Sequence, residues 1–433
     1  MLTMPNAALR SETRRLSYTG DLLSLVPDRG PLVYLECPAR GEALLASGIA
    51  IEVREGGPQR FAAASLRLRA LLRGSIRDES PGPIAIGGFA FEDELSRITR
   101  WRGFGSLSLV VPRRTWLRRG DRIWQIDAEH DGAVELEPPP PVESSPGIHG
   151  PIDDRGTWRE HVATALDAIA SGRLRKVVLA REHTVLLSSD LDPQNVVRRL
   201  RDERPACTTF WVRRGNQSFV GSSPELLARV EGRKVEAVAL AGTARALNAA
   251  GEAAAARALL ECAKNADEHQ LVAAEIRDAL GAVCAELEVS ERVVERVPEA
   301  LHLATRFRGI LGERLCALEV AGLLHPTSAV CGLPRRPARA LIAATESERG
   351  WYAGGIGWVD GSGNGEFSVA LRCGLLEAGR ATLWAGAGIV SGSQPDAEYD
   401  ETATKMQAML RSLEAAQHPV SAGDAPRRDE AVA

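Results

Sequence analysis

Residues 386–405, GAGIVSGSQPDAEYDETATK, constrain the fold more than any other stretch of the sequence. Three glycines in the first seven residues favour a tight turn whose backbone N–H groups point outward, an arrangement that can hold carboxylates or phosphates. Pro395 and Asp396 then mark the start of a helix. The segment therefore predicts a glycine-rich turn that leads into an acidic helix start and can bind an anion.

One face of this predicted helix carries two carboxylates and an ammonium. At about 100° per residue, Glu398, Glu401 and Lys405 project within roughly 60° of one another. They lie beside an apolar stripe formed by Met406, Met409, Leu410 and Leu413. A surface helix with acids near its positive N-terminus is the simpler interpretation of this pattern alone. The alternative is a site for an anionic ligand together with a cation.

Length and composition indicate a globular protein that acts on small molecules. The 433 residues, 44% of them hydrophobic, suffice for one large domain or two ordinary ones. The net charge is −4 and basic residues are scattered, so we expect no nucleic-acid or membrane partner. Seven cysteines without a CxxC pair, and no apolar leader or run of about 20 apolar residues, favour a cytoplasmic protein with reduced thiols.

Apolar runs separated by turn residues predict antiparallel strands interspersed with helices. Strands are expected at 31–35, 48–53, 84–91, 107–111, 123–126, 176–187, 351–360, 365–376 and 382–390, a hairpin at 225–240 with its turn at 231–232, and helices at 61–72, 158–170 and 252–287. The first 15 or so residues look frayed. Four consecutive prolines within 137–146 cannot continue a strand, which predicts a boundary there. We therefore divide the chain into an N-terminal part (1–150), a core (151–415) and a disordered tail (416–433).

Three charged residues lie within or beside apolar stretches of the sequence. Lys176 begins a β-branched run, and Glu225 follows a proline at the start of a strand; taken alone, each is more often an ordinary solvated strand end. Glu268 falls on the apolar face of a predicted helix, where an unpaired charge would be costly. Its partner is either Lys264, one turn earlier, or a metal ion.

The histidines and glycine-rich runs do not match other common catalytic patterns. His302 and His325 lie in segments that look turn-rich, and neither has the His–Cys spacing of a zinc site. No Ser-His-Asp arrangement is legible, and neither nucleotide-binding glycine motif occurs in its required context.

Taken together, nine short motifs resemble those of the chorismate-utilising enzymes in both order and spacing. They are KVVLAR at 176, SPELL at 223, LAGTAR at 240, EH at 268, LHLAT at 301, LHPTSAVCG at 324, VALR at 369, GAGIV at 386 and ExxETxxxK at 398. The resemblance covers about 155–415, and the N-terminal part resembles the menaquinone-type isochorismate synthases. It implies an α+β fold, the chorismate-binding (anthranilate synthase component I-like) fold, with two large antiparallel sheets flanked by helices and an active site between them.

The resemblance also implies a role for each matching residue. Isochorismate formation adds water at C2 of chorismate while the C4 hydroxyl leaves, so it needs one base and one acid. Lys176 matches the general base that deprotonates the water, and Glu225 matches the general acid, which requires a raised pKa. Glu268 and Glu401 match two direct Mg²⁺ ligands, and Glu398 matches a third carboxylate close by that contacts the ion through water.

The remaining matches concern substrate contacts. Arg372, Lys405 and the backbone of Gly386 to Gly388 resemble the cradle for the second carboxylate of chorismate. Pocket-lining contacts are implied for Gly242, Thr243, His302 and Tyr352.

Two alanines select among the members of the family. Aminodeoxychorismate synthases commonly place a nucleophilic lysine where this chain has Ala241, and anthranilate and salicylate synthases typically have threonine where it has Ala329. The expected activity is therefore that of an isochorismate synthase for menaquinone biosynthesis, acting as a cytoplasmic monomer. The alternatives are a salicylate synthase, an anthranilate or aminodeoxychorismate synthase component I, the siderophore pathway, and a catalytically inactive binding protein or scaffold.

Overall fold

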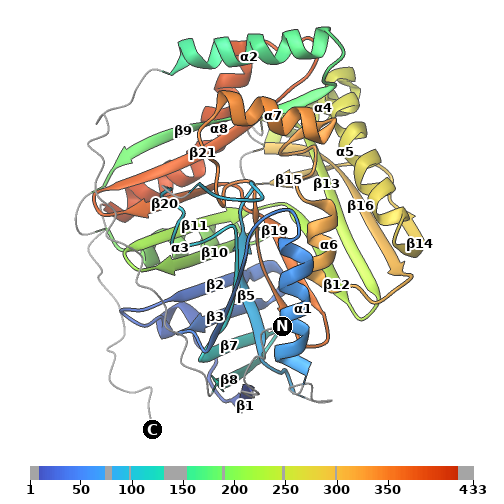
Figure 1. The fold of residues 1–433 in the computed structure, drawn as a ribbon. Helices are drawn as coiled ribbons and strands as arrows, with labels where there is room; N and C mark the ends of the chain where they lie inside the picture. The colour runs from blue at the N-terminus through green and yellow to red at the C-terminus, as the bar shows by residue number, and fades with distance from the viewer. Residues whose placement is uncertain are drawn as a thin grey trace.

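The computed structural model describes residues 9–73, 80–96, 99–130, 154–187, 191–245, 249–297 and 300–417. Within these residues the chain forms two large antiparallel sheets with helices packed around them (Figure 1). This confirms the α+β fold that the sequence predicts.

The eleven-stranded sheet draws on both ends of the chain. Its strands in spatial order are β1 (Leu9–Leu16), β8 (Arg122–His130), β7 (Arg114–Arg119), β3 (Glu42–Ser47), β2 (Leu32–Cys37), β10 (Thr208–Arg214), β11 (Gln217–Ser223), β20 (Cys373–Glu377), β21 (Arg380–Ile389), β9 (Lys176–Leu186) and β17 (Gly332–Leu333).

The ten-stranded sheet mixes the same parts of the chain. Its order is β14 (Cys284–Val289), β16 (Ala300–Leu311), β13 (Lys234–Arg245), β12 (Leu226–Glu231), β19 (Gly365–Val369), β18 (Gly355–Asp360), β5 (Ile84–Phe89), β6 (Leu107–Val111) and β4 (Ile51–Glu55), and β15 (Val293–Val297) also pairs with β16. Strands from residues before 131 therefore complete both sheets.

Helices pack around the sheets and carry part of the candidate site. α5 packs on β13, β14 and β16, and α8 packs on β21. The helices are α1 (Arg60–Leu72), α2 (Arg155–Ala170), α3 (Pro193–Glu203), α4 (Ala249–Glu261), α5 (Ala263–Gly281), α6 (Ala317–Leu324), α7 (Arg335–Thr345) and α8 (Pro395–Gln417), with short 3₁₀ turns η1 (Leu22–Leu25) and η2 (Pro38–Arg40). None of these helices is long and apolar enough to cross a membrane.

The chain crosses from one sheet to the other at two places that matter for function. β11 ends at Ser223 in the eleven-stranded sheet, and β12 begins at Leu226 in the other, so Glu225 lies at the crossing. The return crossing, from β19 to β20, contains Arg372, whose φ of 50° is left-handed. The sequence had predicted one strand over 365–376. The strand instead breaks at this crossing. The sequence could not predict the break, because a buried apolar run has the same pattern whether it stays in one sheet or passes to another.

Buried aromatic rings fill the space between the sheets. Trp101 meets Phe104, Phe219 and Trp384 at centroid distances of 5.5, 5.2 and 5.4 Å. Trp351 meets Phe104 edge-on at 5.3 Å. These offset and edge-to-face contacts favour a rigid core, since aromatic pairs contribute beyond the area that they bury.

Several other element predictions are corrected. The helix expected over 252–287 is in fact two helices, α4 and α5, and Leu287 lies in strand β14. The prediction ran too far because apolar residues at helical spacing continue from α5 into this strand. The segment 301–309, taken as turn-rich, is part of β16. β1 begins at Leu9, within the stretch expected to be frayed, and pairs with β8. α8 runs to Gln417, into the expected tail, whereas the proline run and 418–433 lie outside the described residues.

A buried ion pair fixes the loop before β18 to strand β9. Arg349 is fully buried and donates to the Glu346 carboxylate at 2.7 and 2.8 Å. It also donates to the carbonyl oxygens of Val330 and Val178, both at 2.8 Å. Since Val178 belongs to β9, the guanidinium holds three segments together.

We predict that Arg349→Met lowers the free energy of unfolding by about 3–5 kcal/mol, because it leaves the Glu346 carboxylate buried without its partner. Urea denaturation measures the change. Adding Glu346→Gln removes the stranded charge, so the double variant should be more stable than the single one. An equal or lower stability of the double variant would contradict this explanation.

Candidate active site

A cavity lies where the two sheets meet, and most of the predicted site residues line it. Its walls come from β9, β13, β16, β21, α5, α8 and both crossings between the sheets. The predicted residues that line it are Glu225, Gly242, Thr243, Glu268, His302, Tyr352, Arg372, Gly386, Gly388, Glu401 and Lys405. Predicted residues up to 180 positions apart in the sequence, from Glu225 to Lys405, are therefore gathered at one place.

Lys176 lies behind this lining and contacts it through Glu268. It is the first residue of β9, is fully buried, and places its Nζ 3.0 Å from Oε1 of Glu268. Lys176 and Glu268 are close enough to form an ion pair, but their geometry does not meet that of a hydrogen bond. Glu268 is thus held by Lys176 rather than by Lys264, the partner expected from helical spacing.

Glu225 is a buried carboxyl group whose pKa responds both to burial and to three cations. Burial raises its pKa to about 7, although the charges of Lys176, Arg372 and Lys405 oppose the rise. Its backbone is fixed, since its N–H donates to Ser223 Oγ and its carbonyl accepts from the Val369 N–H. A carboxyl with this pKa can hold a proton near neutral pH and release it, as a general acid must.

α8 and β21 bring a second group of charges into the cavity. Lys405 Nζ lies 2.7 Å from Glu401 Oε1 and donates to the Gly386 carbonyl oxygen at 2.8 Å. Burial alone would raise the pKa of Glu401, but Lys405, assisted by Lys264, lowers it below its ordinary value. Glu401 is therefore an anion at neutral pH, the form that binds cations. Glu398, which is buried beneath the lining, pairs with Lys264 at 2.6 Å.

Two glycines on β21 lie where polar groups approach the backbone closely. A Cβ atom at Gly388 would lie 2.4 Å from Glu268 Oε1, closer than such atoms approach one another. At Gly386 it would lie 3.0 Å from the Leu179 carbonyl oxygen and 3.1 Å from the Tyr352 hydroxyl. Gly388 thus leaves room for the Glu268 carboxylate, and Gly386 leaves room for the Tyr352 hydroxyl.

A β-bulge brings Gly242 and Thr243 next to His302. The register between β13 and β16 shifts between Ala241 and Thr243, and Gly242 has a φ of 72°. His302 Nδ1 lies 3.3 Å from both the Gly242 carbonyl oxygen and Thr243 Oγ1. Burial lowers the pKa of His302 to about 3, so its ring is neutral and can serve only as a hydrogen-bonding group.

Trp384 is a cavity residue that the sequence reasoning missed. Its ring stacks on Tyr352 at a centroid distance of 6.1 Å, and it lines the same wall. The alternation of a strand would have indicated it, because Trp384, Gly386 and Gly388 are two residues apart on β21.

The three predicted metal-binding glutamates have the ligand chemistry that a hard divalent cation requires. Carboxylate oxygens are the ligands that Mg²⁺ prefers, and Glu268, Glu398 and Glu401 supply them from two helices. Within the described ranges no three acidic, histidine or cysteine side chains are already grouped as a metal centre. Each of the three carboxylates contacts a lysine ammonium instead. All three carboxylates therefore lie where a nearby positive charge stabilises them.

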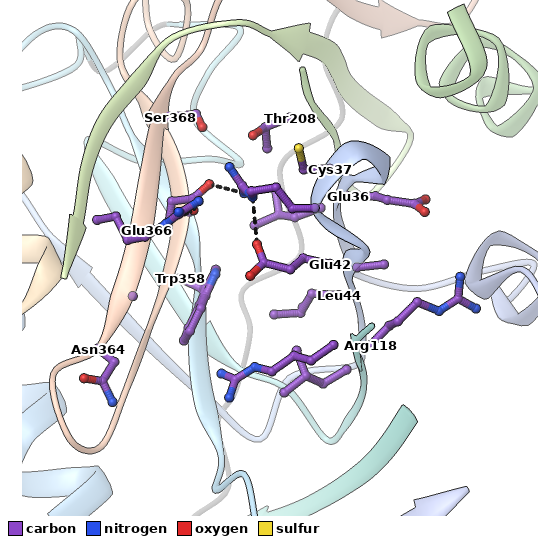
Figure 2. A pocket seen from close by; sticks show the side chains of 18 of the residues that line it. Glu36, Cys37, Glu42, Leu44, Arg118, Thr208, Trp358, Asn364, Glu366 and Ser368 are labelled. Carbon is purple, nitrogen blue, oxygen red and sulfur yellow. Dashed lines mark hydrogen bonds and ion pairs between the residues drawn. The ribbon is translucent and has the colours of Figure 1, made fainter. Parts of the chain in front are cut away.

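A second cavity, of about 270 Å³, lies elsewhere between the sheets and contains none of the predicted site residues. In Figure 2, Glu42 and Glu366 reach into it from β3 and β19. Arg40 joins them, with ion pairs of 2.8 Å to Glu42 and 2.7 Å to Glu366. These contacts tie one sheet to the other, so we assign this region a structural role.

We predict that Glu225→Gln makes the protein progressively more stable than the wild type as pH rises from about 4.5 to 7. In the wild type the folded-state pKa, about 7, exceeds the ordinary value of 4.5, so the stability contributed by the protonated carboxyl is complete at low pH and lost as pH rises through 7. The difference should reach on the order of 3 kcal/mol above pH 7. Urea denaturation between pH 5 and 8 measures it. The exposed Glu288→Gln is the control, and a difference that does not vary with pH would contradict the burial argument.

Comparisons with known proteins agree with this geometry. The family model described as chorismate binding enzyme matches residues 21–130 and 128–414. The salicylate biosynthesis isochorismate synthase of Pseudomonas aeruginosa is 36% identical over 409 residues, covering 89% of this chain and 85% of that protein. Isochorismate synthase MenF of Bacillus subtilis is 31% identical over 361 residues, covering 78% and 76%. The structure of MenF from Escherichia coli, described as a menaquinone-specific isochorismate synthase, matches with a TM-score of 0.79 and 25% identity over 95% of this chain and 96% of that one. Because the family model spans most of the sequence and these relatives align along nearly its whole length, the chain belongs to the chorismate-binding enzymes.

Proposed function

We propose that this enzyme is an isochorismate synthase, an isomerase that reversibly converts chorismate to isochorismate with Mg²⁺. The observation that carries the proposal is that a buried lysine and a buried carboxyl of raised pKa are brought together with cations that can bind a dicarboxylate. The names of the relatives agree with the isomerase assignment.

Each chemical step has a residue suited to it. The Lys176 amine, once it has given up its proton, would deprotonate the water that attacks C2. Glu225, protonated below about pH 7, would donate its proton to the C4 hydroxyl as it leaves. Water enters and water leaves, so the conversion needs neither an oxidant nor a second substrate.

The other residues would bind and orient the substrate. Arg372 and Lys405 supply positive charge at the cavity for one carboxylate of chorismate. Glu268 and Glu401, with Glu398 beneath them, would hold the ion. When bound, Mg²⁺ would offset the charge of the second carboxylate beside these acids. The neutral His302 and the Tyr352 hydroxyl would contribute hydrogen bonds.

The choice among the family's activities rests on two small residues in the cavity wall. Ala241 lines the cavity, so the nucleophilic lysine of aminodeoxychorismate synthases is replaced by a methyl group. Ala329 lines it as well, where threonine is typical of salicylate and anthranilate synthases. Both observations favour hydroxyl transfer over elimination of pyruvate or attack by ammonia.

We further propose that the product supplies menaquinone biosynthesis and that the enzyme acts as a cytoplasmic monomer. The resemblance of the N-terminal part to menaquinone-type enzymes supports the pathway. Supply of salicylate is the second candidate, because the relative from P. aeruginosa is named for salicylate biosynthesis.

The first experiment incubates the purified protein with chorismate and Mg²⁺, without ammonia, and follows the products by chromatography. We expect isochorismate to approach a plateau without pyruvate, and we expect Lys176→Ala to be inactive. Chelation of Mg²⁺ should abolish turnover of the wild type. Pyruvate or salicylate as main product would instead indicate a salicylate synthase.

A second experiment tests Ala329. We predict that Ala329→Thr increases pyruvate release about tenfold or more, because the added hydroxyl and methyl change the shape and hydrogen bonding of the cavity. The matched control is Ala285→Thr on the exposed face of β14, which should leave the products unchanged. An unchanged product ratio in Ala329→Thr would remove this residue as the discriminator.

A further inference from the structure

Lysine is scarce in this protein, and it is concentrated at the candidate metal ligands. The chain has only four lysines among its 53 basic residues. Three of them, Lys176, Lys264 and Lys405, each contact one of the three carboxylates assigned to Mg²⁺. Arginine grips a carboxylate with a planar fork, whereas lysine offers a compact point charge. A lysine ammonium can therefore separate from its carboxylate more readily than an arginine guanidinium could.

Of these three ammoniums, that of Lys264 is the one placed to move. Lys176 is fully buried, and Lys405 is held a second time by the Gly386 carbonyl oxygen. The Lys264 side chain, near the start of α5, is 39% exposed, while its partner Glu398 is only 4% exposed. Their atoms are 2.6 Å apart, so a partly exposed cation neutralises a buried anion.

Lys264 also lies within electrostatic reach of all three carboxylates. Its ammonium interacts most strongly with Glu398, and then with Glu268 and Glu401. One positive charge thus already stands among the three groups that would share a divalent ion.

An open groove leads from solvent to this point. The groove, of about 1000 Å³, follows α5, and Lys264 and Glu268 both line it. Glu268 lines the candidate active site as well, so it separates the two spaces. Acidic side chains outnumber basic ones along the groove: it is lined by Asp267, Glu268, Glu275 and Asp278 against Arg175 and Lys264. A cation that enters along α5 is attracted by this wall and reaches the carboxylates beside Lys264.

We propose that Lys264 is a built-in counter-cation, which holds Glu398 in place before metal binds and is displaced toward the groove when Mg²⁺ arrives. The inference rests on the proposed function only in assigning Mg²⁺ to these carboxylates. It makes Lys264 a positioning residue that competes with the ion: it keeps the acidic site assembled and, for the same reason, weakens metal binding.

The test measures metal binding without substrate, using Mn²⁺ by electron paramagnetic resonance and Mg²⁺ by calorimetry. We expect Lys264→Met to bind both ions about tenfold more tightly than the wild type, since one competing charge is gone. Lys264→Arg should bind more weakly, because a guanidinium fork releases a carboxylate less readily. Lys234→Met, the same change on an exposed hairpin, is the control and should match the wild type.

Thermal unfolding supplies a second measurement that does not depend on activity. In a chelator, Lys264→Met should melt below the wild type, because Glu398 is left buried without a partner. Adding Mg²⁺ should therefore raise its melting temperature by more than it raises that of the wild type. A merely structural ion pair would give the first effect without the second.

Two results would overturn the proposal in distinguishable ways. Equal or weaker metal binding by Lys264→Met, with Mg²⁺-dependent isochorismate formation intact in the wild type, would reject the counter-cation role alone. If neither protein bound Mn²⁺ or Mg²⁺ while isochorismate still formed, the metal part of the proposed function would fail, and the inference with it.

Discussion

The pairing of buried carboxylates with lysine ammoniums is the interaction on which the candidate site depends. Glu268, Glu398 and Glu401 approach a shared cavity from two helices, and their mutual repulsion in a partly buried space would oppose folding. Lys176, Lys264 and Lys405 each neutralise one of them. The site can therefore be assembled before any ligand arrives, and this pre-organisation is what catalysis by charge stabilisation requires.

The two sheet crossings explain why the active site lies where it does. A strand that leaves one sheet for the other has a few residues outside both ladders, and these are free to point into the space between the sheets. Glu225 occupies such a position where the chain leaves the eleven-stranded sheet, and Arg372 occupies one where the chain returns to it. They are nevertheless held firmly, because strands of both sheets continue immediately on either side. The fold thus combines the exposure of a loop with the rigidity of a sheet.

The sequence predicted the two-sheet fold, the start of α8 at Pro395 and, through short motifs, the residues that line the cavity. It did not predict the break at Arg372, because apolar periodicity carries no information about which sheet a strand joins. For Glu268 it offered two partners, Lys264 or a metal ion, and did not identify Lys176. Lys264 is one turn away on α5, whereas the tertiary fold brings Lys176 from β9 to Glu268 and leaves Lys264 to Glu398 on α8. Such long-range pairings are set by packing and cannot be read from local spacing.

The environments of Glu225 and Glu401 show how one cavity can hold two carboxyl groups in different protonation states. Both are buried, and burial alone raises the pKa of each. Glu401 has an ammonium 2.7 Å away, which lowers its pKa below the ordinary value, whereas the cations near Glu225 form no close pair with it and its pKa stays near 7. Proximity of a cation, rather than residue type, therefore separates the carboxylate that we propose binds metal from the carboxyl that we propose donates a proton. Since Lys405 is held by both Glu401 and the Gly386 carbonyl oxygen, the glycine-rich strand β21 helps to maintain that separation.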